Sequence, residues 1–158
     1  SHPEGAQRII VVGYGPVGKQ LTGILRDNNL DVVVVEMNID TVRQVSALGE
    51  KIIYGDATQR EVLLHAGAEE AEGLIISSSS APAGEIVEVA RAINPNLRIL
   101  VHTTYLRVAE NLKSEGVSAV FSGEREVAVA MTENLMRDFG ATDEQIDRER
   151  RKLRERMA

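Results

Sequence analysis

The chain has 158 residues, a size typical of one domain that can bury about two thirds of its unfolded surface. Its 43% hydrophobic and 27% charged residues lie in the ordinary range for globular proteins, which excludes wholesale disorder and collagen-like sequences. A net charge of -6 and 3% aromatic residues argue against nucleic acid as a partner, because phosphate binding needs basic surface and base stacking needs aromatic rings. With no cysteine, the chain cannot form disulfides or thiolate metal sites and is compatible with the cytosol.

The opening residues lack the basic and apolar regions of a signal peptide. Residues 1–5 are interpreted as the remnant of a purification tag or a disordered end, and they are excluded from the fold prediction. No apolar run approaches the roughly 20 residues that cross a bilayer, so we predict no direct membrane insertion.

Short apolar, β-branched runs alternate with longer segments patterned at three and four residues, which is typical of βαβ units. The continuous run Val32–Val35 suits a parallel strand buried on both faces. The sequence therefore predicts an α/β fold: a Rossmann-like, doubly wound, parallel six-stranded sheet in the order 3-2-1-4-5-6. The predicted strands are Arg8–Val12, Val32–Val35, Lys51–Tyr54, Leu74–Ile76, Arg98–Val101 and Ala119–Phe121.

Helices are expected between these strands. Asn38 and Thr58 are predicted N-caps, because their side chains can accept hydrogen bonds from free backbone N–H groups, and Asn94-Pro95 is predicted to end the fourth helix. The predicted helices are Pro16–Asn28, one after Asn38, a short one after Thr58, Ala83–Ile93, and one near Tyr105–Glu115.

Two further helical segments follow the core domain, which is assigned to residues 6–123. The segment 124–140 ends at Gly140, a good C-cap, and has an apolar face formed by Val127, Met131, Leu135, Met136 and Phe139. The segment 141–158 is strongly charged and has a sparse apolar stripe of Ile146, Leu153 and Met157. It is either a helix leaning on a partner or a solvated helix.

A glycine string directly follows the first predicted strand and opens the first helix: Gly13-Tyr14-Gly15-Pro16-Val17-Gly18. In that context, G-x-G-x-x-G indicates dinucleotide binding by free N–H groups at a helix N-terminus. Gly13 would permit the tight turn, Gly15 the close approach of a pyrophosphate, and Gly18 close packing of helix on strand. Pro16 suits the first helical turn because it lacks an N–H.

A carboxylate stands where the second predicted strand ends. Glu36 can accept hydrogen bonds from the ribose hydroxyls of an adenosine, and it would repel a 2′-phosphate. The next residues, Met37 and Asn38, offer no arginine for that phosphate, so NADP is disfavoured. The alternative interpretation is a glycine turn kept for packing, with Glu36 as a solvated charge.

The third and fourth predicted strands deliver further candidates to the same edge of the sheet. Asp56 either reaches the adenine amino group or forms a turn with Thr58 that caps the next helix. Ser77 and Ser78 open a run of four serines, which either lines the second half of a nucleotide site or is a flexible loop.

These motifs resemble the nucleotide-binding N-lobe of regulators of potassium conductance and of the Trk and Kef potassium transport systems (the RCK/KTN or TrkA-N family). The likeness covers nearly all of residues 8–140 and includes Tyr54-Gly55-Asp56-Ala57-Thr58, Ala71–Ile76 and Asn94–Ile99. It is most similar to the C-terminal domain of Kef-type cation/proton antiporters. The resemblance implies that Gly13, Gly15, Gly18, Glu36, Asp56 and Ala57 contact a nucleotide. The full candidate set is Gly13, Tyr14, Gly15, Pro16, Val17, Gly18, Glu36, Met37, Asp56, Ala57, Ser77 and Ser78.

The same resemblance implies a nucleotide-sensing regulatory domain on the cytoplasmic, soluble face of an inner-membrane potassium or cation/proton transport system. It would bind an adenine nucleotide, NAD(H) or AMP/ADP/ATP, form a homodimer through the helix at 124–140, and gate transport through dimer geometry. The transporter domain would be fused to it or associated with it, as with a separate Trk-like subunit. Where many relatives carry an arginine after the fifth strand, this chain has His102-Thr103-Thr104-Tyr105.

An NAD-dependent oxidoreductase fragment is the alternative from another functional class, because dehydrogenases share the nucleotide fold. The sheet and its helices use nearly every residue through Phe139, which leaves no second domain for a substrate pocket. No catalytic triad, Lys/Tyr pair or metal-ligand cluster stands out. We therefore expect no catalytic residue and no metal site.

Overall fold

A computed structural model describes residues 6–104, 111–113 and 115–157. In that part of the chain the strands are β1 (Arg8–Val12), β2 (Asp31–Glu36), β3 (Ile52–Tyr54), β4 (Gly73–Ile76), β5 (Arg98–Thr103) and β6 (Ala119–Ser122). They form one six-stranded parallel sheet in the order β3-β2-β1-β4-β5-β6, which confirms the predicted fold and strand order. Each strand lies within two residues of its predicted bounds.

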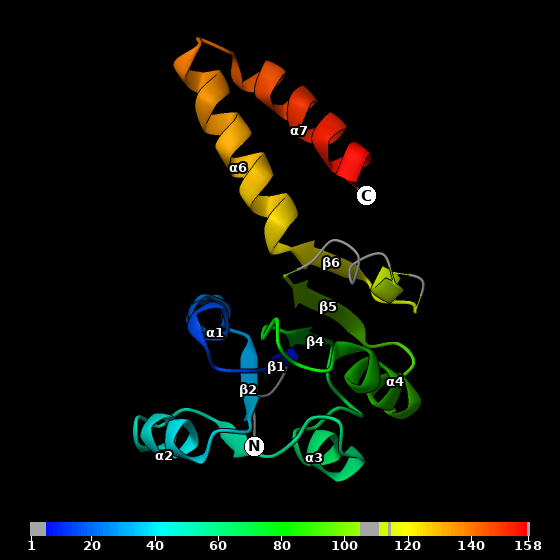
Figure 1. The fold of residues 1–158 in the computed structure, drawn as a ribbon. Coiled ribbons are helices and arrows are strands. Elements are labelled where there is room, and N and C mark those ends of the chain that lie inside the picture. Colours follow the sequence, from blue (N-terminus) through cyan, green and yellow to red (C-terminus); the bar gives the residue numbers. More distant parts are fainter. Residues whose placement is uncertain (1–5, 105–110, 114, 158) are drawn as a thin grey trace.

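The helices are α1 (Pro16–Asp27), α2 (Ile39–Ala47), α3 (Arg60–His65), α4 (Ala83–Ile93), α6 (Gly123–Asp138) and α7 (Asp143–Met157). Helices α1 and α2 lie on one side of the sheet and α3 and α4 on the other (Figure 1). Alternate residues of β1 follow this division, because Val11 packs in a cluster with Leu25 of α1, whereas Ile10 belongs to the cluster that holds Leu63 of α3 and Ile86 of α4. The valines of β2, Val32–Val35, are all buried, as expected for a strand covered on both faces.

Of the two predicted N-caps, one is present in the structure and one is not. Asn38 is confirmed as an N-cap, since its side chain accepts hydrogen bonds from the N–H groups of Asp40 and Thr41. The prediction for Thr58 is wrong. Helix α3 begins at Arg60 with Gln59 as its N-cap, because Asp56 Oδ1 draws the N–H and hydroxyl of Thr58 into a turn before the helix starts.

The structure describes the whole of the fourth predicted helix but only part of the fifth. Helix α4 ends at Ile93 with Asn94 as its C-cap, as the Asn94-Pro95 pair predicts. The helix expected near Tyr105–Glu115 falls mostly outside the described residues, and residues 111–113 are helical.

Helices α6 and α7 form a hairpin that projects beyond β6 (Figure 1). Phe139, not Gly140, is the C-cap of α6, and Gly140 follows it with a φ of +82°. The N–H of Gly140 donates to Arg137 O and that of Ala141 to Met136 O, the two bonds of a Schellman motif. Thr142 and Gln145 then exchange backbone-to-side-chain bonds of 2.8 and 3.2 Å, which make a capping box for α7.

Helix α7, which lies in the charged segment, packs against α6. Ile146 of α7 is 1% exposed, and Arg150 of α7 pairs with Glu133 of α6. Of the predicted apolar stripe, Ile146 is therefore buried where α7 packs against α6. No helix in the described ranges combines the length and the apolar character that a bilayer span requires.

A buried carboxylate ties the amino-terminal edge of the sheet together. The side chain of Asp31 is 2% exposed, and its two oxygens lie 2.9 Å from Arg8 Nη2 and 2.7 Å from Lys51 Nζ. Burial favours the neutral acid, but the hydrogen bonds and positive charges of Lys51 and Arg8 outweigh it and hold the pKa of Asp31 below its ordinary value. This network lies at the edge opposite to the loops that carry the glycine string.

Candidate nucleotide-binding site

The glycine turn joins β1 to α1 with a backbone conformation that residues other than glycine rarely adopt. Gly13 has a φ of +99°, and its N–H donates to Val35 O at 2.9 Å. A Cβ on Gly18 would lie 2.1 Å from Gly13 O, so α1 can approach the turn this closely only with glycine there. A Cβ on Gly15 would meet nothing within 4 Å, which leaves open space where the sequence predicts a pyrophosphate.

The first turn of α1 points backbone donors toward that space. Pro16 is the first helical residue, and Gly15 is the N-cap and makes no side-chain bond. Lys19 N–H is the first to find a helical acceptor, Gly15 O at 2.9 Å. The N–H groups of Val17 and Gly18 precede it in the helix, and such first-turn amides have no acceptor within their own helix. Amides at a helix N-terminus are donors of the kind that can bind phosphates.

Glu36 is fixed beside the glycine turn by backbone amides. Its Oε1 accepts from Tyr14 N–H at 3.1 Å, and its Oε2 accepts from the N–H groups of Met37 and Asn38 at 2.6 and 3.0 Å. The carboxylate therefore links the β1–α1 turn to the β2–α2 turn. This arrangement differs from a free, solvated strand-end charge. Oε1, with one of these bonds, retains acceptor capacity for a ribose hydroxyl.

The β3–α3 turn carries the next carboxylate. Asp56 is half-buried and uses Oδ1 to accept both the N–H and the hydroxyl of Thr58, at 2.9 and 2.8 Å. Ala57 beside it is 3% exposed. The turn that the sequence offers as one alternative for Asp56 is thus present, and it holds the acid at the carboxyl edge of the sheet.

The serine run follows β4 at the switch point of the sheet, next to β1. Ser77 is buried and its hydroxyl donates to Val12 O at 2.8 Å, with Gly13 O at 3.0 Å, so this hydroxyl braces the glycine turn from within. Ser78 Oγ lies 3.0 Å from Ser80 Oγ. His102 at the end of β5 reaches over the same point, with Nδ1 2.8 Å from Ser77 O. A carbonyl only accepts, so Nδ1 carries the proton and Nε2 remains for another partner.

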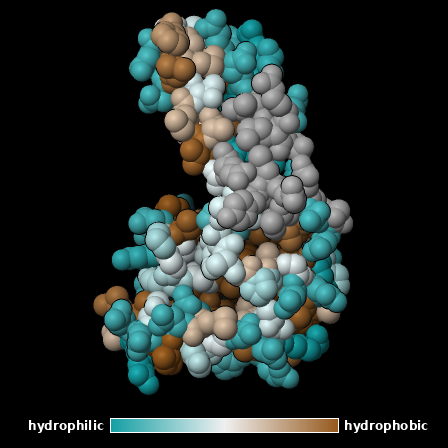
Figure 2. Space-filling view, in the orientation of Figure 1, coloured by the Kyte–Doolittle hydropathy of each residue, from teal (hydrophilic) through white to brown (hydrophobic). Residues whose placement is uncertain are grey.

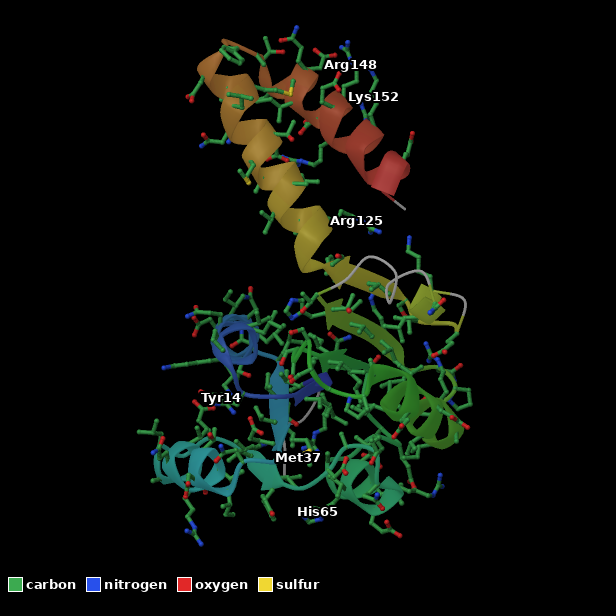
Figure 3. All side chains as sticks on the ribbon, in the orientation of Figure 1. Tyr14, Met37, His65, Arg125, Arg148 and Lys152 are labelled. Carbon is green, nitrogen blue, oxygen red and sulfur yellow. The ribbon has the colours of Figure 1, made fainter. Side chains whose placement is uncertain are left out.

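These turns surround one cavity of about 440 Å³, and all twelve residues of the candidate set line it. Tyr14 of the first turn and Met37 of the second are labelled in Figure 3; Met37 is 62% exposed. The candidate set omits some residues that line the cavity, among them Gly55, Pro82, Ile86 and His102. Gly55 lies within a quoted motif, whereas Pro82 and Ile86 carry no chemical signal and come to the cavity only through the path of the β4–α4 loop.

Other candidate chemistry lies away from the cavity. His65, labelled in Figure 3, belongs to α3 and does not line it. Among the residues that the structure describes, no group of three or more His, Asp or Glu side chains is placed to hold a metal ion.

Comparison with known proteins connects this geometry to transport proteins. The chain is 34% identical over 127 residues to the putative cation/proton antiporter YbaL of Escherichia coli (strain K12), an alignment covering 80% of this chain and 23% of the antiporter. The chain thus spans about a quarter of the length of that relative.

Two solved structures have the same fold. The TrkA-N domain of the inner membrane protein YbaL from Escherichia coli superimposes with a TM-score of 0.79 at 32% identity, over 84% of this chain and 99% of that domain. The Kef CTD of Shewanella denitrificans in its AMP-bound form gives a TM-score of 0.78 at 25% identity, over 95% of this chain and 92% of the other. The TrkA-N domain family itself matches residues 9–123, and the chain belongs to that family.

Proposed function

We propose that this domain binds an adenine nucleotide without a 2′-phosphate in the cavity at the carboxyl edge of the sheet. The observation that carries the proposal is that two features lie side by side: the first-turn amides of α1, which have no acceptor within the helix, and the carboxylate of Glu36. Three backbone N–H groups hold that carboxylate in place. The phosphate would rest against Gly15, Val17 and Gly18, and the ribose against Glu36. The similar Kef CTD, which holds AMP, supports the same ligand class. NADP is disfavoured because its 2′-phosphate would meet the carboxylate of Glu36.

Isothermal titration calorimetry with AMP and NAD⁺ tests this site. Glu36→Ala is expected to weaken both ligands by about tenfold or more, the effect of losing a charge-assisted hydrogen bond. Glu70→Ala is the matched control, since it removes an exposed glutamate that does not line the cavity. Circular dichroism must show that both variants fold. Equal affinity in Glu36→Ala and the control would remove Glu36 from the site, and no binding of AMP, ADP, ATP, NAD⁺ or NADH would refute the proposal.

We also propose that a second copy of the chain covers the exposed face of α6. Val127, Met131, Leu135 and Phe139 are 58, 69, 55 and 80% exposed. Their four-residue spacing makes one apolar stripe, and Figure 2 shows brown, hydrophobic atoms along this part of the molecule. Helix α7 packs on α6 elsewhere, through the face that carries Glu133. An unpartnered apolar stripe on an otherwise capped helix hairpin favours self-association about a twofold axis.

Sedimentation velocity tests the dimer. Met131→Asp places a charge in the stripe and is expected to give a monomer at concentrations where the wild type is dimeric. Ser46→Asp adds the same charge to an exposed residue of α2, outside α6, and is expected to leave the dimer intact. A wild-type monomer, or a dimer in Met131→Asp, would contradict this interface.

Regulation of transport is the role that follows from these two proposals. The domain would serve as the cytoplasmic part of a potassium or cation/proton transport system, fused or associated, and nucleotide would bias the dimer between arrangements that the transporter senses. A ligand shifts such an equilibrium only by its difference in affinity for the two states. Flux measured in vesicles with the full transport system, with and without nucleotide, is the test; flux indifferent to both nucleotide and Glu36→Ala would refute regulation.

The enzyme alternative makes an opposite prediction. If the domain were an oxidoreductase fragment, NADH absorbance would fall on incubation with an electron-accepting substrate. We expect NADH to be recovered intact, because the residues that line the cavity include no pair arranged for hydride or proton transfer among those that the structure describes.

A further inference from the structure

Four residues form one row across the carboxyl edge of the sheet, and each follows a different strand position in register. The register partners along β2, β1, β4 and β5 are Val35, Val12, Ile76 and Val101. The residues that come directly after these partners are, in the same order, Glu36, Gly13, Ser77 and His102. All four line the cavity. Glu36 and His102 therefore lie at the two ends of the row, with the glycine turn between them.

Both ends of the row offer a hydrogen-bond acceptor. Glu36 Oε1 accepts from Tyr14 N–H and has capacity for a second donor. His102 Nδ1 lies 2.8 Å from Ser77 O, so Nδ1 donates there and the neutral ring has its lone pair on Nε2. An imidazole held in this way accepts from a hydroxyl group. A fully ionised phosphate, which only accepts, would gain no hydrogen bond from it.

The middle of the row offers donors instead. Helix α1 begins at Pro16, and the N–H groups of Val17 and Gly18 in its first turn have no acceptor within the helix. Such amides favour phosphate. The cavity thus presents an acceptor, then donors, then a second acceptor. The complementary ligand carries a hydroxyl, phosphate and a second hydroxyl in that order, which is the pattern of two ribose rings joined through a pyrophosphate.

The order of the strands separates the two acceptors. In the pose proposed above, the ribose that Glu36 holds lies on the β2 side of the phosphate. His102 lies on the β5 side, beyond β4, so it faces the half of the cavity that an adenosine monophosphate leaves open. A group that donates to Nε2 must then come from the far side of the phosphate.

We propose, resting on the nucleotide site above, that His102 binds the second ribose of a ligand in which a pyrophosphate joins adenosine to another ribose, as in NAD⁺ and ADP-ribose. A hydroxyl of that ribose donates to Nε2. AMP and ADP carry no second ribose, so His102 contributes nothing to their affinity. His102 is therefore the residue by which the domain distinguishes the longer ligands from the shorter ones.

Calorimetry with AMP, ADP, ADP-ribose and NAD⁺ tests this assignment, because ADP-ribose is ADP with a second ribose on its terminal phosphate. His102→Asn keeps an N–H that can donate to Ser77 O but removes Nε2. It is expected to weaken ADP-ribose and NAD⁺ by about fivefold, the effect of losing one hydrogen bond, and to leave AMP and ADP within about twofold. His65→Asn is the matched control, since His65 is exposed on α3 and does not line the cavity.

The two shorter ligands separate contact from support. If His102 served only to brace Ser77 and the glycine turn, His102→Asn would weaken all four ligands alike or none of them, and either result would overturn the assignment while the nucleotide site stands. Nitrogen NMR of the wild type needs no variant: the Nε2 resonance of His102 should shift with ADP-ribose and not with ADP, and equal shifts would also overturn it. Failure of every nucleotide to bind the wild type would overturn both proposals.

Discussion

Replacement of Gly18 by alanine is the sharpest test of how the glycine turn is built. The added Cβ would lie 2.1 Å from Gly13 O and 2.7 Å from Ser77 Oγ. Both neighbours are fixed, since Gly13 donates its N–H to Val35 O and the Ser77 hydroxyl bonds to the turn. Relief of the clash requires α1 to move away from β1 by roughly 1 Å, which is overpacking of a fixed core contact.

Overpacking of this kind costs about 3 kcal/mol of unfolding free energy. Gly23→Ala is the matched control, because Gly23 lies in the same helix and a Cβ there would meet nothing within 4 Å. Alanine at an open helix position is expected to add about 1 kcal/mol of stability. The same substitution, five residues apart, should thus lower the free energy of unfolding at Gly18 and raise it at Gly23. The two variants should differ by roughly 4 kcal/mol.

Urea unfolding followed by far-ultraviolet circular dichroism, at one protein concentration for all variants, measures this gap. The reasoning is refuted if the free energy of unfolding of Gly18→Ala lies within about 0.5 kcal/mol of the wild-type value. A loss of stability in Gly23→Ala as large as that in Gly18→Ala would also refute it, because the effect would then belong to the helix and not to the turn.

Two further substitutions test contacts remote from the cavity. Asp31→Asn is expected to cost about 2 kcal/mol at neutral pH, because it leaves Arg8 and Lys51 without their buried carboxylate. Because the pKa of Asp31 is lower in the folded than in the unfolded state, its ionised carboxylate stabilises the fold above about pH 4, and this stabilisation is lost as the pH falls through the folded-state pKa. In acid, the free energy of unfolding of the wild type should therefore no longer exceed that of Asp31→Asn. Urea unfolding at several pH values measures this difference. Asn94→Ala should cost about 1–2 kcal/mol, because Asn94 Nδ2 donates to Ala68 O at 3.0 Å and Ala71 O at 3.2 Å. Exposed Asn96→Ala is its control, and equal thermal stability of the two variants would show that these bonds contribute nothing.

The fold was predictable because its signals are local and repeated. Continuous valine runs, the Asn38 cap and the Asn94-Pro95 stop each fix an element independently, and crossover handedness then restricts the strand order. The Thr58 cap was predicted wrongly because two side chains compete for one turn, and residue type alone does not reveal that Asp56 takes the hydroxyl.

The candidate site was predictable where the chain marks it with glycine or a strand-end acid. Its remaining parts come from tertiary placement. Ser77 reads as a loop hydroxyl in the sequence, yet its hydroxyl is bonded inside the protein to Val12 O. His102 gains its place over the switch point only because β5 lies beside β4 in the sheet. That nucleotide contacts these residues stays a prediction.

The central position of β1 has a consequence for the chain as it leaves the ribosome. Residues 8–54 can already pair β1, β2 and β3, but the other edge of β1 must wait for residues 73–76, since Ile9–Val12 pairs there with Gly73–Ile76. During that interval a valine- and isoleucine-rich edge is open to other nascent chains. Synthesis that pauses between β3 and β4 would therefore prolong the exposure of this unpaired edge, and slow codons in that stretch should lower the yield of native protein.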